Sequence, residues 1–184
     1  MEQALVFVSI VLGVAVAFEL EHLNKLLRAG NVKWHWAQPL FALLVLMTIM
    51  SFWWMLASSD DRGEVTLAAF LPIMWVLVLL NLLAAASLPD HVPEGGIDLA
   101  KYYQENRRYL WGLYFLIVAP LGINWIIVGF RRSEDFWDIL PYLATELLPM
   151  TVVAAMIFAK RWSHVAIGFA AMGLVVAAWL TRAL

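Results

Sequence analysis

Six long apolar runs, separated by short polar or charged stretches, dominate the pattern of hydrophobic and polar positions along the chain. The runs extend over about Ala4–Leu23, Gln38–Ala57, Leu67–Leu88, Tyr109–Phe130, Ile139–Ala159 and Val165–Leu184. Each reaches the about 20 residues that an α-helix needs to cross a bilayer, and none has the polar–apolar alternation of a membrane β-strand. The pattern predicts an all-α fold: a polytopic membrane helix bundle of six transmembrane helices, with residues 1–184 forming a single transmembrane domain.

Only one connection between the runs, Pro89–Arg108, has a pattern of its own. Turn-forming residues fill its first half, and Asp98 is placed to cap a helix over about 98–108. We expect this helix to lie at the membrane surface and to run into the fourth span. The other connections are too short to hold an extramembrane domain.

Lysine and arginine are distributed unequally between alternate loops. Eight of the twelve lie on one side and four on the other. The larger set is Lys25, Arg28, Lys33, Lys101, Arg107, Arg108, Lys160 and Arg161, and the smaller is Arg62, Arg131, Arg132 and Arg182. Because cytoplasmic loops carry the excess, we expect the first, third and fifth loops in the cytoplasm and both termini outside. A cytoplasmic link between two sets of three spans gives a 3+3 arrangement, as in inverted-repeat transporters.

Composition excludes several classes of function. Of the 184 residues, 64% are hydrophobic and 14% charged, against about 45–50% apolar and about 25% charged in soluble domains. The net charge of −2 offers no basic surface for nucleic acid. The absence of cysteine removes disulfides, thiolate catalysis and Fe–S clusters.

Glu146 is the most conspicuous polar residue in an apolar run, because it lies seven residues into the fifth. Carboxylates inside a membrane are costly and are functional by default. Pro149 has no N–H to donate to the carbonyl of Thr145, so we expect a kinked helix with a free carbonyl beside the carboxyl group. Such a pair is typical of a cation or proton site. The alternative is a neutral Glu146 that is hydrogen-bonded across the bundle as a structural tie.

A second group of polar residues ends the first run. Glu19 and His22 are three residues apart and share a helix face, whereas Glu21 and Lys25 are four apart and can form an ion pair. A salt-bridged helix end explains Glu21 and Lys25 better than it explains Glu19, which lies one turn deeper. Glu-x-x-His is also half of the ferritin-like di-iron motif, but there is no second copy, and we expect no metal site. Glu19 and His22 join Glu146 as candidates for an ion or proton pathway.

The fourth run contains Pro120 and Gly122 only two positions apart. This spacing predicts a kink or a short unwound stretch, whose exposed carbonyls are tolerated only against protein or water. Asn124 is placed to line this break. We therefore expect helix breaks at Pro120–Gly122 and at Pro149, with Asn124 beside the pathway.

Small residues recur at helical spacing on two of the runs, where they allow helices to approach closely. They are Ser9, Gly13 and Ala17 on the first run and Ala166, Ala170, Gly173 and Ala177 on the sixth. These faces are either internal helix contacts or an oligomer interface.

Most tryptophans fall near the ends of the runs, among them Trp34, Trp36, Trp53, Trp54 and Trp111. This distribution predicts an aromatic belt at the membrane–water interface.

Nothing in the sequence indicates a cofactor or a catalytic group. The four histidines lie near helix ends or in loops, whereas a membrane haem needs histidines that face each other within spans. There is no His-Glu-x-x-His motif, and Ser9, Ser51 and Ser87 have no His or Lys at helical spacing to activate them. We expect no cofactor, and an enzyme is the least favoured class.

Two segments in the middle third of the chain carry a resemblance. They are Gln38-Pro39-Leu40 through Ser51-Phe52-Trp53-Trp54, and Leu88-Pro89-Asp90 followed by Asp98-Leu99-Ala100-Lys101-Tyr102-Tyr103 and Asn106-Arg107-Arg108-Tyr109. In these the chain resembles uncharacterised small bacterial integral membrane proteins with six helices. The resemblance implies a multi-pass protein of the bacterial cytoplasmic (inner) membrane, and it implies no activity or site residue.

Two functions follow as hypotheses. One is a pathway, as an ion channel or in transport, for protons, cations or a small solute, centred on Glu146 with the broken fourth span and Glu19. The other is non-catalytic: a subunit or assembly partner of a larger membrane complex, or a lipid-binding component. The expected partners are membrane lipid and either further copies of the chain, as a homo-oligomer, or a membrane-complex partner. We expect no nucleic-acid partner.

Overall fold

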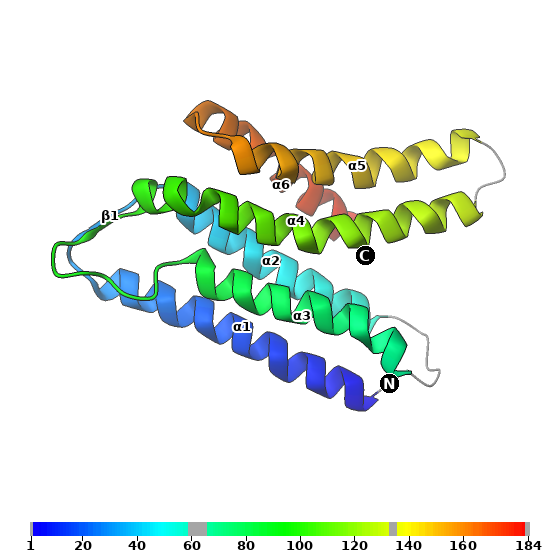
Figure 1. Ribbon diagram of the computed structural model, residues 1–184, viewed down its shortest axis with the longest axis horizontal. Coiled ribbons are helices and arrows are strands. Elements are labelled where there is room, and N and C mark those ends of the chain that lie inside the picture. The colour runs from blue at the N-terminus through cyan, green and yellow to red at the C-terminus, as the bar shows by residue number, and fades with distance from the viewer. Residues whose placement is uncertain (1, 59–65, 133–135, 183–184) are drawn as a thin grey trace. The chain divides into compact units, whose positions relative to one another are not determined.

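The computed structural model describes residues 2–58, 66–132 and 136–182, which form six α-helices and two short β-strands (Figure 1). The elements are α1 (Glu2–Arg28), β1 (Val32–Lys33), α2 (Ala37–Ala57), α3 (Leu67–Ser87), β2 (Ile97–Asp98), α4 (Leu99–Arg132), α5 (Phe136–Phe158) and α6 (Trp162–Arg182). Arg62 and the last two residues of the predicted sixth span lie outside the described residues.

The all-α fold class is confirmed, because a helix covers each predicted apolar run. The bounds of α2 and α3 agree with the predicted runs to within one residue. Four helices, α1 to α4, are long and apolar enough to cross a membrane. The apolar stretches within the described parts of α5 and α6 are shorter, at Leu143–Phe158 and Trp162–Ala177.

The helix predicted over about 98–108 is not a separate element, because it forms the start of α4. At 34 residues, α4 is about 51 Å long, well beyond the about 30 Å of a bilayer core. Neither proline nor glycine interrupts the chain between Leu99 and Gly112, so the surface segment and the fourth span form one helix. The predicted cap is confirmed: Asp98 Oδ1 accepts hydrogen bonds from the backbone N–H groups of Ala100 and Lys101, at 3.0 and 3.2 Å.

The chain divides into two compact units, Met1–Glu105 and Asn106–Leu184. In the first unit, α1, α2 and α3 pack against one another. In the second unit, α5 packs against α6, and the ring of Trp111 on α4 contacts that of Phe169 on α6, with centroids 5.5 Å apart.

The loops that follow α1 and α3 are joined at one end of the first unit. β1 and β2 pair in parallel, with Val32 opposite Ile97, and Asn31 Nδ2 donates a hydrogen bond to the carbonyl of Glu94 at 3.0 Å. Gly96 has a φ of +84°, and a Cβ there would overlap the carbonyl oxygen of Asn31. Glycine is therefore needed where the two loops meet.

Below the joined loops lies a small apolar core. Leu26, Ala42, Leu88 and Leu99 are buried together there. These residues come from α1, α2, the position directly after α3 and the start of α4, and Val32, Val92 and Ile97 of the two loops pack against them.

The tryptophans follow the predicted interfacial pattern only in part. Trp34, Trp36, Trp53 and Trp54 are exposed, as a belt requires. The prediction is wrong for Trp111, which is fully buried and makes edge-to-face ring contacts with Tyr114 and Phe169. Because α4 begins at Leu99, Trp111 lies well inside that helix and not at its end.

Candidate functional site

Four polar side chains are buried inside the first unit. Glu19 is 1% exposed, His22 7%, and Gln38 and Ser87 are 0% exposed. They come from three helices: Glu19 and His22 from α1, Gln38 from the first turn of α2, and Ser87 from the last turn of α3. We refer to these four residues as the polar cluster.

The spacing of buried residues on α1 brings Glu19 and His22 into the cluster. Ala15, Glu19, His22 and Leu26 are all buried and recur at intervals of four, three and four, which keeps them on one face of a helix. This face packs against α2 and α3. Two polar residues thus replace apolar ones in the middle of a packed stripe.

Hydrogen bonds connect the members from α2 and α3. Gln38 Nε2 donates to the backbone carbonyl of Ser87. The Ser87 hydroxyl donates to the carbonyl of Ala84 at 2.9 Å, and it lies beside the carboxyl group of Glu19. These contacts hold the start of α2 against the end of α3.

The remaining atoms of the cluster are buried without a hydrogen-bond partner among the described residues. They are both carboxyl oxygens of Glu19, Nδ1 of His22 and Oε1 of Gln38. The single proton of the Ser87 hydroxyl is given to Ala84. If the hydroxyl turned towards Glu19 instead, one carboxyl oxygen would still be unsatisfied. Buried polar atoms normally have partners, so this arrangement calls for an additional ligand or proton.

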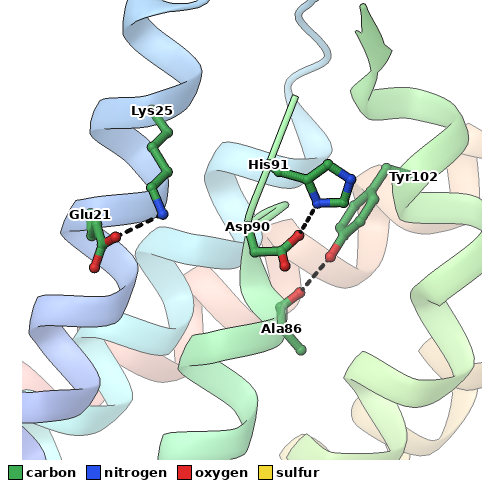
Figure 2. A network of polar contacts seen from close by, with 6 residues as sticks. All are labelled: Glu21, Lys25, Ala86, Asp90, His91 and Tyr102. Carbon is green, nitrogen blue, oxygen red and sulfur yellow. Dashed lines mark hydrogen bonds and ion pairs between the residues drawn. The ribbon is translucent and has the colours of Figure 1, made fainter. Parts of the chain in front are cut away.

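Other polar residues near this end of the first unit have different surroundings. Glu21 is paired with Lys25 at 2.7 Å, as predicted, and both side chains are about half exposed. Figure 2 shows this pair and the contact of Asp90 with His91, also 2.7 Å. The hydrogen bond from His91 holds the pKa of the exposed Asp90 carboxyl below its ordinary value. These exposed pairs are typical of a solvated surface.

The Tyr102 hydroxyl, also drawn in Figure 2, donates to the carbonyl of Ala86 at 3.2 Å. This bond ties the first turn of α4 to the last turn of α3. It fixes the helix end that carries Ser87.

The other predicted pathway residues lie in the second unit. Glu146 is half-buried, and its Oε2 lies 3.7 Å from the position that a Cβ on Gly122 would take. Asn124 is exposed. The structure therefore brings Glu146 and Gly122 together and places Asn124 on an exposed face of α4.

The helices run through the predicted breaks. Every residue of Leu99–Arg132 is helical, including Pro120 and Gly122, so this segment has no unwound stretch. α5 likewise continues through Pro149. Thr145 and Glu146 both interact with other groups in the structure.

The predicted small-residue faces are exposed. Added side-chain atoms at Gly13 and Gly173 would meet nothing within 4 Å. The other members of the two faces, Ser9, Ala17, Ala166, Ala170 and Ala177, are exposed as well. Ser9 accepts a hydrogen bond from Trp53 Nε1 at 3.0 Å. Close helix contacts in the second unit are instead made at Gly168, against Met156, and at Gly122, against Met150.

Sequence reasoning missed two members of the polar cluster, Gln38 and Ser87. Gln38 was the first residue of a span, and Ser87 was considered only as a nucleophile without a base. One signal was present in the sequence: both lie at span ends that are predicted to face the cytoplasm, as His22 does.

The donor set of the cluster is one carboxylate, one imidazole, one amide and one hydroxyl. Within the described parts of the chain, no group of three or more His, Cys, Asp or Glu residues could hold a metal ion. Comparisons of the chain with protein-family models, curated proteins and solved structures give no match.

Proposed function

We propose that this chain is an integral membrane protein that forms a pathway for protons or small cations, with Glu19 as its essential carboxylate. One observation carries the proposal: Glu19 is almost fully buried among three apolar helices, and the hydroxyl beside its carboxyl group, that of Ser87, gives its proton to Ala84. Because a buried polar group is costly unless it is satisfied, such a carboxylate is typical of sites that take up an ion or a proton.

Glu146 is the second carboxylate of the proposal. Its half-burial beside Gly122 supports a weaker role than that of Glu19, because a partly exposed group is less costly to keep in place.

The membrane arrangement that we propose has six spans in a 3+3 arrangement. The lengths of α5 and α6, 23 and 21 residues, correspond to about 34 and about 31 Å, which supports them as spans of a core about 30 Å thick. The division after Glu105 supports two sets of three spans.

We further propose the bacterial inner membrane, with the loops after α1, α3 and α5 in the cytoplasm and both termini outside. The pairing of β1 with β2 supports a common side for the first two of these loops, and the excess of lysine and arginine supports the cytoplasm.

The test of the function is ion flux in liposomes that contain the purified protein. We expect the wild-type chain to dissipate an imposed gradient of protons or of a small cation. Glu19→Gln should lower the flux to the rate of protein-free liposomes, because the amide cannot release a proton or neutralise a cation.

Glu21→Gln is the matched control. It makes the same chemical change two residues away on the same helix, but at an exposed carboxylate paired with Lys25, and it should keep the wild-type flux. Wild-type flux in Glu19→Gln would contradict the assignment of Glu19. A wild-type protein that moves no ion would contradict the pathway itself.

A non-catalytic role, as subunit or assembly partner of a homo-oligomer or larger membrane complex, is the second candidate. The exposed small-residue face of α6 favours it, because such faces allow a neighbouring helix to approach closely. If this role is correct, Gly173→Leu should disperse the complex. The wild-type protein should move no ion in the flux assay. A complex of unchanged size in that variant would argue against this role.

A further inference from the structure

The polar cluster has an unequal inventory of donors and acceptors. One N–H of the Gln38 amide donates to the Ser87 carbonyl, and the Ser87 hydroxyl proton is given to the carbonyl of Ala84. The atoms without partners among the described residues are three oxygens, two of Glu19 and one of Gln38, together with Nδ1 of His22. The oxygens can only accept when Glu19 is ionised. A group that satisfies these three oxygens must therefore be positive or must donate.

No fixed positive charge is available from the helices packed around Glu19. Ala37–Ala57 and Leu67–Ser87, which form α2 and α3, contain no Asp, Glu, Lys, Arg or His. On α1 itself, Lys25 is paired with Glu21 on the exposed side. Among the described residues of α1, α2 and α3, the other buried titratable side chain is His22, one turn further along α1.

The charge of the site limits what it can hold. A single carboxylate is neutralised by one monovalent cation, whereas a divalent cation would leave a net positive charge in a low-dielectric interior, at a high cost. Carboxylate, amide and hydroxyl oxygens are hard ligands, which suit hard cations better than soft transition metals.

The position of Ser87 adds a second electrostatic contribution. Ser87 is the last residue of α3, and the C-terminal end of a helix carries a partial negative charge. Helix C-terminal ends that point into a membrane protein are used to coordinate sodium ions or protons. The end of α3 therefore favours a cation beside Glu19.

We propose that Glu19, Gln38 and Ser87 form a binding site for one monovalent alkali cation of the sodium type, which competes with one proton at Glu19. The proposal rests on the assignment of Glu19 in the proposed function and names the ion. Cation binding forms the contacts to oxygen and releases the carboxyl proton to solvent, so one positive charge replaces another and the site stays neutral.

The experiment measures cation binding and proton release on the purified full chain in detergent, without transport. The probe is radioactive sodium ion for binding. In parallel, sodium chloride is added to a weakly buffered, mildly acidic sample that contains a pH indicator, with choline chloride as the control salt. We expect saturable sodium binding at one ion per chain, and release of up to one proton per chain that choline does not cause.

Three variants locate the binding. Glu19→Gln should abolish both sodium binding and proton release, and Glu21→Gln, the exposed control, should keep both. Gln38→Leu removes one oxygen ligand and should weaken sodium binding by about tenfold or more. It also provides a second test if Glu19→Gln does not fold, which gel filtration will reveal.

Three results would overturn the inference: no sodium binding by the wild type, binding that survives in Glu19→Gln, or binding without proton release. The proposed function fails separately. If proton flux depends on Glu19 but sodium does not bind, the proposed pathway holds and the sodium site is refuted. If sodium binds but no ion moves, the sodium site holds and the pathway is refuted.

Discussion

Glu19 and Glu146 are both carboxylates in apolar helices, but the two units of the chain give them different surroundings. In the first unit, Glu19 is 1% exposed and lies with the buried polar side chains of His22, Gln38 and Ser87. In the second unit, Glu146 is half-buried next to Gly122 and already interacts with another group. The hydroxyl beside the Glu19 carboxyl gives its proton to Ala84, whereas Glu146 interacts with another group.

The difference shows that depth along an apolar run is a poor guide to burial. Glu146 is far from the ends of its run, whereas Glu19 is near the end of its own. Burial depends on which helix face meets a neighbouring helix, and the face of α1 that carries Glu19 packs against α2 and α3. The units also differ in one structural detail each. In the second unit, helices pack closely at a glycine, and in the first, two loops are joined at one end of the packed helices.

The largest stability effect is expected for the packing of the second unit. Gly168→Leu should lower the free energy of unfolding by about 1–3 kcal/mol, because a Cβ at this position would overlap the sulfur of Met156. Gly173→Leu makes the same change on the same helix at a position where the added atoms meet open space. It should change the free energy of unfolding little. Thermal unfolding in detergent compares the two. Equal melting temperatures would contradict the close contact of α5 with α6.

The joined loops of the first unit are tested next. Gly96→Ala should lower the free energy of unfolding by at least about 1–2 kcal/mol. The positive φ of this residue is unfavourable for a residue with a Cβ, and the Cβ would overlap the Asn31 carbonyl. Gly95→Ala is the matched control, since a Cβ at the preceding residue meets nothing within 4 Å. Thermal unfolding again measures the difference. If both variants were equally stable, the two loops would not meet at Gly96.

A smaller effect is expected at the start of α4. Asp98→Ala should lower the free energy of unfolding by about 1 kcal/mol, because it removes the acceptor for the N–H groups of Ala100 and Lys101. Asp98→Asn keeps an oxygen acceptor and should retain most of the stability. Amide hydrogen exchange at Ala100 and Lys101 checks the site directly, and unchanged exchange in Asp98→Ala would refute the cap.

The smallest effect concerns the exposed contact of Asp90 with His91. His91→Ala should raise the pKa of Asp90 towards its ordinary value, because the hydrogen bond that lowers it is lost. The contact stabilises the wild type above the ordinary carboxyl pKa, and this contribution disappears as the pH falls through the lowered pKa. The effect is slight because both side chains are about three-quarters exposed. A carbon NMR titration of labelled aspartate measures the pKa of Asp90. An unchanged pKa of Asp90 in His91→Ala would contradict the contact.

Local patterns predicted much of the fold. The bounds of α2 and α3 follow from apolar run length, and the Asp98 cap follows from the side chain that precedes a helix. The pairing of β1 with β2 was not predicted, because two-residue strands have no periodicity and their partners are separated by more than 60 positions along the chain. The positive φ of Gly96 depends on that same pairing.

The candidate site was predicted only in part. Glu19 and His22 were recognisable because polar residues are rare within an apolar run and the two share a helix face. Their neighbours Gln38 and Ser87 come from other helices, and the only signal that these helix ends meet is that all of them are predicted to face the cytoplasm. Of the two local expectations near Pro120, a kink or a short unwound stretch, the continuous helix α4 excludes the unwound stretch.

The most direct test of the central claim is the ion flux of Glu19→Gln and Glu146→Gln, reconstituted in parallel at equal protein-to-lipid ratio. If Glu19 is the essential carboxylate, Glu19→Gln has the flux of protein-free liposomes and Glu146→Gln retains a flux clearly above that background. Loss of flux in Glu146→Gln, together with wild-type flux in Glu19→Gln, would contradict the claim.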